Sequence, residues 1–307
     1  MAEELMAETA VSRKKMILAD VALVLAALFW GANFVVAKAA LDLIPPFTYL
    51  GLRFIIAAVL LAAACWRKML KATRQDLLAG LLAGFFLWAG FAFQTVGLLY
   101  TTPAKSGFIT GISVVLVPFL YILVTRKSPG WFSFAGGSLA LVGLFLLSGA
   151  SLQPQLGDAL TFICAIGFAA HIVALGVFAP RQDPVVLTIV QMALTGAGSM
   201  VLALLFEPLS GMFSHPPLVW GAILFAVLFC TIGAFLIQNM AQRFTPPTHA
   251  ALILSTEAVF AGIFSFLFWS ESFTIPKLAG ALLIFAGIVL TELKPVLVAG
   301  SARRYEA

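Results

Sequence analysis

The residue best placed to carry out chemistry is Glu257, an acidic residue near the middle of the long apolar run 247–269. The other twelve of the thirteen acidic residues fall in the termini, in polar segments or near the ends of apolar runs. A charged group at the centre of a membrane-spanning helix costs about 2.5–3.5 kcal/mol on insertion scales, so its presence needs a reason. A carboxyl group in that environment suits proton coupling. The alternative is a structural carboxyl group that pairs with a neighbouring helix.

Two basic residues, Lys38 and Arg53, lie near the ends of the runs 17–38 and 47–65. Long basic side chains in such positions commonly extend to the membrane surface. The alternative for Arg53 is that it binds the carboxylate or phosphate of a small solute through charge-assisted hydrogen bonds. We therefore include Arg53 among the candidate substrate-binding residues.

Uncharged polar and aromatic side chains inside the apolar runs complete the set of candidates. Amide and imidazole groups there either line a cavity or hydrogen-bond one helix to another. Tryptophan is commonly found at the membrane surface, so tryptophans away from it suggest an aromatic wall for an apolar or cationic solute. The alternative is that they face lipid or pack in the core, as most of the aromatic residues of such a chain do. In addition to Arg53, the candidates for contact with a solute are Trp30, Asn33, Trp88, Gln94, His171 and Gln238.

The composition of the chain shows what surrounds these residues. Of 307 residues, 62% are hydrophobic and 10% are charged, and the mean hydropathy is +1.07. Soluble domains are about half apolar and a quarter charged, so the natural solvent of this chain is lipid. The three cysteines, Cys65, Cys164 and Cys230, lie in apolar runs without paired spacing, and there is no glycine-rich phosphate loop. We expect no metal site, no cofactor and no nucleic-acid partner.

Ten apolar runs are long enough to cross a membrane, which takes roughly 20 residues in a helix. Proline, glycine and charged clusters separate them, as in Arg126–Gly130 and Arg181–Pro184. The sequence therefore predicts an all-α integral membrane protein with ten transmembrane helices. The predicted spans are 17–38, 47–65, 77–99, 103–125, 131–149, 157–178, 184–206, 218–242, 247–269 and 275–292.

Lysine and arginine predict how these spans are oriented. With the N-terminus in the cytoplasm, fourteen of the eighteen basic residues fall in cytoplasmic segments and only Lys105 and Lys277 fall in external loops. Cytoplasmic loops carry an excess of such residues, so this orientation is favoured. We expect a multi-pass protein of the inner (plasma) membrane with both termini in the cytoplasm.

The second half of the chain repeats the first. An offset of 138 residues aligns Asp20 with Asp158 and Pro46 with Pro184, and an offset of 144 aligns Gln94 with Gln238 and Gly136 with Gly280. The predicted units are residues 17–149 and 157–292, flanked by cytoplasmic tails at 1–16 and 293–307. Five spans per unit is an odd number, so the two units should enter the membrane from opposite sides. Such inverted repeats are typical of transporters with a binding site near the membrane midplane.

Four stretches of the chain are similar to a known family. Trp30–Lys38, Arg53–Phe54, Gly97–Gly111 and Ala250–Phe260 resemble motifs of the EamA branch of the drug/metabolite transporter superfamily. The resemblance covers nearly the whole chain. It implies ten helices in two five-helix units and a carrier that moves small metabolites, often amino acids or drugs, outward. It implies no particular substrate.

These observations predict a secondary transporter that exports small organic metabolites by alternating access with proton coupling through Glu257. The alternative within transport is an uncoupled facilitator of the same solutes, with Glu257 structural. A membrane-embedded enzyme is a remote alternative, because His171, His215 and His249 are scattered and no metal-ligand or nucleophile pattern is present. We expect no enzyme activity. The expected partners are the lipid bilayer and a small-molecule substrate, and a homodimer stays open.

Overall fold

The computed structural model describes residues 2–100, 103–148, 155–208, 213–269 and 274–305, and all regular structure in these ranges is helical. The predicted all-α class is therefore confirmed. The helices are α1 (Ala2–Leu41), α2 (Pro46–Ala64), α3 (Trp66–Met69), α4 (Arg74–Leu98), α5 (Pro103–Gly111), α6 (Ser113–Thr125), α7 (Trp131–Ser148), α8 (Leu156–Phe178), α9 (Pro184–Phe206), α10 (Pro217–Phe225), the π-helix η1 (Ala226–Gly233), α11 (Ala234–Ala241), α12 (Pro247–Leu254), α13 (Glu257–Trp269) and α14 (Ile275–Tyr305).

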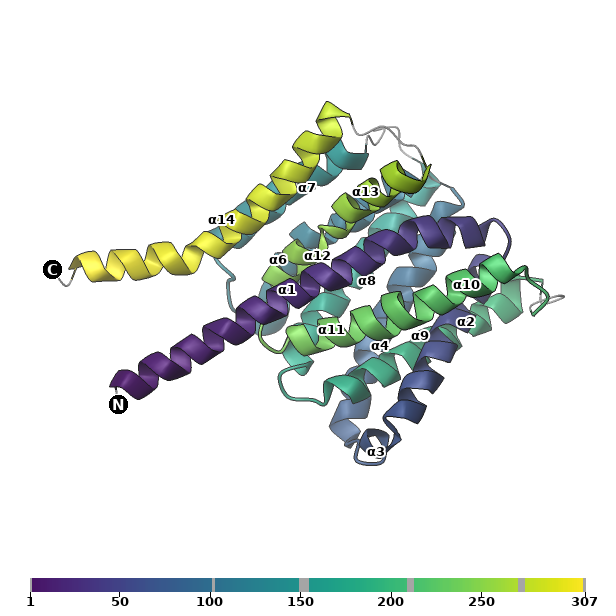
Figure 1. Cartoon of the computed structure of the whole chain (residues 1–307), viewed down its shortest axis with the longest axis horizontal. Helices are drawn as coiled ribbons and strands as arrows, with labels where there is room; N and C mark the ends of the chain where they lie inside the picture. Colours follow the sequence, from purple (N-terminus) through teal and green to yellow (C-terminus); the bar gives the residue numbers. More distant parts are fainter. Residues whose placement is uncertain (1, 101–102, 149–154, 209–212, 270–273, 306–307) are drawn as a thin grey trace.

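Nine helical stretches of the described chain are long and apolar enough to cross a membrane. A further apolar stretch of α14, Ile275–Thr291, is shorter. These ten stretches coincide with the spans expected from the sequence, while the count of ten crossings stays a prediction. In Figure 1 the N-terminal end of α1 and the C-terminal end of α14 lie on the same side of the molecule.

Two of the predicted spans are broken rather than continuous. The span 103–125 is divided into α5 and α6 at Ile112, and the span 247–269 is divided into α12 and α13 at Ser255 and Thr256. At the second break, the Ser255 and Thr256 hydroxyls donate to the carbonyl oxygens of Leu252 and Ile253, each at 2.7 Å. Such local hydrogen bonds compete with regular helix geometry. The offset of 144 aligns the two breaks, so both copies interrupt the same helix.

A third span contains a π-helix, which the sequence analysis did not predict. The stretch Pro217–Ala241 passes from α10 through η1 into α11 without leaving the helical path. The matching segment of the first copy, residues 82–89, lies inside the regular helix α4. π-Helical turns are rare and are frequent at functional sites.

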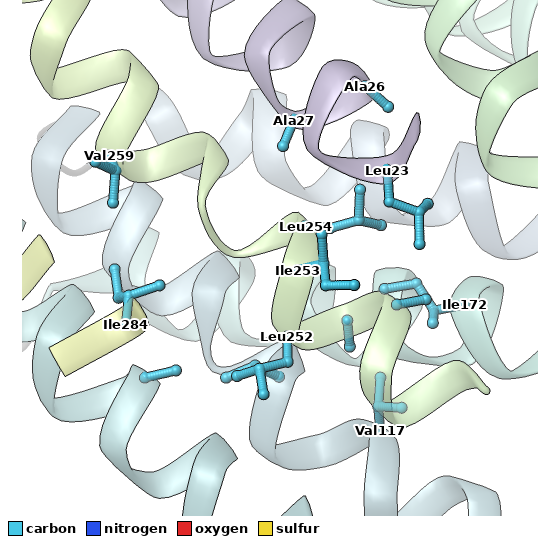
Figure 2. Close-up of a cluster of buried hydrophobic side chains, with 14 of the residues drawn as sticks. Leu23, Ala26, Ala27, Val117, Ile172, Leu252, Ile253, Leu254, Val259 and Ile284 are labelled. Carbon is cyan, nitrogen blue, oxygen red and sulfur yellow. The ribbon is translucent and has the colours of Figure 1, made fainter. Parts of the chain in front are cut away.

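Helices of one copy pack mainly against helices of the other. The helix α14 lies beside α7, α2 beside α9, and α4 beside α8 and α9. In Figure 1 the long helix α1 passes between α12 and α13 on one side and α10 and α11 on the other. The interior seam next to α1 is apolar. Figure 2 shows Leu23 of α1 close to Leu254 of α12, with Ile172 of α8 nearby.

Polar contacts at the helix ends join loops that are distant in the sequence. Lys68 forms an ion pair with Asp183, with 2.8 Å between Nζ and Oδ2. Glu207, at the end of α9, accepts hydrogen bonds from the backbone N–H groups of Phe47 and Thr48 at 2.6 and 2.7 Å. Its carboxylate therefore caps the N-terminus of α2, where a negative charge is favourable.

Candidate functional site

Arg53 is the most buried charged side chain of the described bundle, with 2% of its surface exposed. It comes from the middle of α2 and points at the π-helix. Its Nε donates to Thr231 Oγ1 at 2.6 Å, and its Nη2 donates to the Cys230 carbonyl oxygen at 3.2 Å. The guanidinium also lies over the rings of Phe54 and Phe91, at 5.1 and 5.8 Å from their centroids. The expectation that Arg53 extends to the membrane surface is therefore wrong.

Trp30 of α1 meets the same π-helical turn. Its indole N–H donates to the Cys230 carbonyl oxygen at 2.8 Å, so this oxygen accepts from both Trp30 and Arg53. The Trp30 ring lies 5.1 Å from the ring of Phe235, which in turn lies 6.0 Å from Phe54. The structure thus brings Trp30 and Arg53 together within one aromatic cluster.

His171 of α8 joins this cluster from a further helix. Its ring lies 6.1 Å from that of Phe235, and its Nε2 is 2.9 Å from Oε1 of Gln191 on α9. Both side chains are buried. The Gln191 Nε2 group has no hydrogen-bond partner in the described part of the chain. A buried amide N–H group without a partner costs free energy, so a solute or water that accepts a hydrogen bond from it would be stabilised there.

A second polar group, formed by Gln94, Thr110 and Cys164, lies in the region of Glu257, the first residue of α13. Gln94 of α4 donates to Thr110 Oγ1 of α5 at 3.1 Å, and Thr110 Oγ1 is 3.8 Å from Cys164 Sγ of α8. The Glu257 carboxyl lies within electrostatic range of that thiol. The structure therefore places Gln94 and Glu257 in the same region, next to both helix breaks.

The setting of Glu257 differs from that of an ordinary structural carboxylate. The side chain is partly buried, and among the described residues its carboxyl group has neither an ion pair nor a hydrogen bond. Its place in the first turn of α13 favours a negative charge, because the N-terminal end of a helix is positive. A Cβ atom on Gly31 of α1 would lie only 2.8 Å from the Glu257 carbonyl oxygen, so α1 packs directly on this turn.

The remaining candidates are not brought into these two groups by any hydrogen bond or ring contact of the described residues. Trp88 packs against Phe85 and Gly198, at the contact between α4 and α9, and its indole N–H has no partner there. Asn33 and Gln238 each carry a buried side-chain oxygen without a partner in the described chain. The side chain of Lys38 lies outside the described residues.

An apolar cavity of about 730 Å³ lies between α1, α10 and α13. Phe29, Ala32, Phe225 and Phe268 are among its lining residues, all of which are apolar or glycine. Its lining side chains carry no hydrogen-bonding group for a polar solute. The two polar groups, and not this cavity, are the candidate site.

Thr231, Cys230 and Gln191 are not among the candidate site residues expected from the sequence, although the alignment of the two copies pairs Gln191 with Arg53. The offset of 138 aligns Arg53 with Gln191, and the offset of 144 aligns Thr231 with Leu87. Both residues of the Arg53–Thr231 hydrogen bond are therefore replaced by uncharged or apolar residues in the other copy. The sequence shows each difference separately, and only the structure shows that Arg53 and Thr231 are in contact.

Polar and ionisable side chains enclosed by membrane-spanning helices, next to interrupted helices, are typical of membrane transporters. Comparison with known proteins agrees with this class. The model of the EamA-like transporter family matches residues 17–149 and 155–293, which together cover nearly all of the chain. The chain belongs to this family.

Relatives and a solved structure extend the comparison. An uncharacterized transporter of Archaeoglobus fulgidus is 34% identical over 284 residues, which cover 91% of this chain and 87% of that protein. The uncharacterized transporter YetK of Bacillus subtilis is 28% identical over 295 residues, with 92% and 88% covered. A solved structure titled "Crystal structure of protein" superposes with a TM-score of 0.76 at 20% identity and covers 90% of this chain and 97% of that one. At this identity the likeness concerns the fold alone.

Proposed function

We propose that the protein is a secondary transporter of the plasma membrane that exports a small organic metabolite by alternating access, coupled to protons through Glu257. The observation that supports coupling is an acidic side chain in a membrane-spanning segment, at a helix break, without an ion pair among the described residues. A carboxyl group that lacks a fixed partner can gain and lose a proton without breaking a structural contact. Trp30, Arg53 and His171 form the proposed substrate site. Gln94, in the region of Glu257, and Asn33, Trp88 and Gln238 are further candidates.

The proposed mechanism requires two inverted five-helix units, and several contacts support them. The interrupted helices lie at matching positions of the two copies. The pairing of α4 with α8 and α9 has its counterpart in the pairing of the span Pro217–Ala241 with α1 and α2. A two-fold relation between the units produces such reciprocal contacts. The excess of basic residues in the predicted cytoplasmic segments supports cytoplasmic termini.

An uncoupled facilitator is the second candidate function, and the partial charge of the α13 N-terminus favours it. If this end of the helix holds Glu257 permanently ionised, the carboxylate stabilises the break without carrying protons. No enzyme activity is proposed, since the relatives are named as transporters.

The test begins with a substrate screen and continues in proteoliposomes. Amino acids, nucleosides, sugars and cationic drugs are compared for their ability to raise the melting temperature of the purified protein. Uptake of the solute that binds is then measured with and without a pH gradient, for the wild type and for Glu257→Gln. We expect the gradient to accelerate the wild type only, while the variant retains exchange down the solute gradient.

The matched control is Glu207→Gln, which changes a carboxylate at a helix end, and we expect it to keep its response to the gradient. Gradient-driven uptake by Glu257→Gln at the wild-type rate would exclude the coupling role. A wild type that ignores the gradient would identify a facilitator.

A further inference from the structure

Arg53 carries a buried positive charge without a counter-ion in the described part of the chain. Its two hydrogen-bond acceptors, the Thr231 hydroxyl and the Cys230 carbonyl, are both uncharged. No carboxylate of a described residue forms an ion pair with it. Removing a guanidinium from water without an opposite charge is costly, and buried charges are normally paired. The site is therefore incomplete in charge.

The π-helix fixes the orientation of the guanidinium. Thr231 Oγ1 accepts a hydrogen bond from Arg53 Nε and donates one to the Ala226 carbonyl oxygen at 2.8 Å. These two hydrogen bonds fix the orientation of the hydroxyl group. The Cys230 carbonyl is held in place by Trp30 as well as by Arg53. A guanidinium has five N–H donors, of which two are used here, and three therefore remain for a ligand.

Aromatic rings enclose the guanidinium. Phe54 and Phe91 present their faces to it, and Phe235 and Trp30 continue the same cluster. Such a surrounding excludes water and strengthens any charge-assisted hydrogen bond formed inside it. It also provides contact area for an apolar or aromatic part of a ligand.

The two copies differ at both partner positions, and only one contains the π-helix. Arg53 and Thr231 of one interface correspond to Gln191 and Leu87 of the other, where α4 is a regular helix. The fold therefore forms without a guanidinium, a hydroxyl or a π-helical turn at this contact. Packing of the helices therefore does not require that Arg53, Thr231 and the π-helix occur together in one interface.

From this geometry we infer that Arg53 binds the acidic group of the transported solute, and that Thr231 is the positioning residue that aims its guanidinium. The substrate class is an organic anion, with a carboxylate or phosphate-like group and an apolar or aromatic part. This inference rests on the proposed function, since it names the solute of the same site.

Binding by the purified protein tests the inference without any transport measurement. The probes share one aromatic skeleton and differ in the end group: 3-phenylpropanoate, 2-phenylethylphosphonate, the neutral 3-phenylpropanamide and the cation 2-phenylethylammonium. Affinities are measured by calorimetry in detergent for the wild type, Arg53→Lys, Arg53→Gln, Thr231→Ser and Thr231→Val. Thr161→Val is the matched control, because it removes the hydroxyl of a different buried threonine, which lies in α8 and bonds to the Gly157 carbonyl oxygen.

We expect the wild type to bind an anionic probe at least about tenfold more tightly than the amide or the cation. Arg53→Gln should abolish this preference and Arg53→Lys should keep part of it. Thr231→Val should weaken anion binding by about tenfold, Thr231→Ser should restore it, and Thr161→Val should have no effect. The carboxylate and the phosphonate identify which acidic group is preferred.

Equal binding of the amide, preference for the cation, or absence of binding by every anion would overturn the inference. So would an unchanged anion preference in Arg53→Gln. If Arg53→Gln does not yield a monodisperse protein, Arg53→Lys and the Thr231 pair decide the question. Anion binding together with absent export would count against the proposed function alone.

Discussion

The backbones of Gly143 on α7 and Gly280 on α14 are in direct contact. A Cβ atom on Gly143 would be only 2.5 Å from the Gly280 carbonyl oxygen. Gly287 and Gly136 repeat this contact, with 2.5 Å between a Cβ on Gly287 and the Gly136 carbonyl oxygen. The sequence repeat aligns Gly136 with Gly280 and Gly143 with Gly287. Exchanging the two copies therefore converts the contact of Gly143 with Gly280 into the contact of Gly287 with Gly136. A two-fold axis between α7 and α14 would produce this reciprocal pair of contacts.

The first prediction is that Gly143→Ala destabilises the protein. The added methyl group would meet backbone atoms that cannot move aside, and such overpacking costs about 1–3 kcal/mol. We expect a clearly lower melting temperature in detergent. The control is Gly221→Ala on α10, where a Cβ would have no atom within 4 Å. An equal effect of both substitutions would show that helix propensity, not the contact between α7 and α14, determines the result.

The second prediction concerns the carboxylate that caps α2 from another helix. Glu207→Ala removes the acceptor of the Phe47 and Thr48 backbone N–H groups. Loss of a cap costs about 1 kcal/mol, so the melting temperature should fall. Glu207→Gln keeps one acceptor oxygen, so its melting temperature should fall less. A melting temperature of Glu207→Ala equal to that of the wild type would mean that water replaces the carboxylate at no cost.

The third prediction is a pH dependence of stability that involves Asp183, outside the membrane-spanning segments. Partial burial raises the pKa of this carboxyl, but hydrogen bonds from Lys68, Val185 and Val186 lower it by more than burial raises it. The pKa of Asp183 therefore lies below its ordinary value of 3.8. A depressed pKa stabilises the folded state at pH values above the ordinary one. This contribution is lost as the pH falls through the folded-state pKa.

The measurement compares melting temperatures of the wild type and Asp183→Asn between about pH 3 and pH 7. We expect the variant to be less stable at neutral pH and the difference to shrink below about pH 4. Lys68→Gln is the control, because it removes the exposed ion pair and leaves both backbone hydrogen bonds, so it should show a smaller change. A difference that does not depend on pH would refute the role of ionisation.

The sequence predicted the helical class and the position of the apolar spans because hydrophobic length alone determines them in a membrane. It did not predict that Arg53 is buried. The burial of Arg53 depends on the π-helix η1 in the second repeat of the chain, and the extra residue per turn of a π-helix has no sequence signature. The break before Glu257 rests on Ser255 and Thr256 bonding to their own backbone, a choice that the same residues do not make in every helix. The grouping of Gln94 with Glu257 depends on helix rotations, which spacing along the chain does not give.

The last prediction distinguishes inverted from parallel repeats. Ser128 and Thr274 are exposed residues in the loops that follow the broken helices of the two copies. If the units are inverted, these loops lie on opposite sides of the membrane, and positively charged residues predict that Ser128 faces the cytoplasm. With Cys65, Cys164 and Cys230 replaced, a membrane-impermeant thiol reagent added to intact cells should label Thr274→Cys and spare Ser128→Cys. After the cells are lysed, both should react. Labelling of both residues in intact cells would place the two loops on one side, which five spans per copy cannot produce.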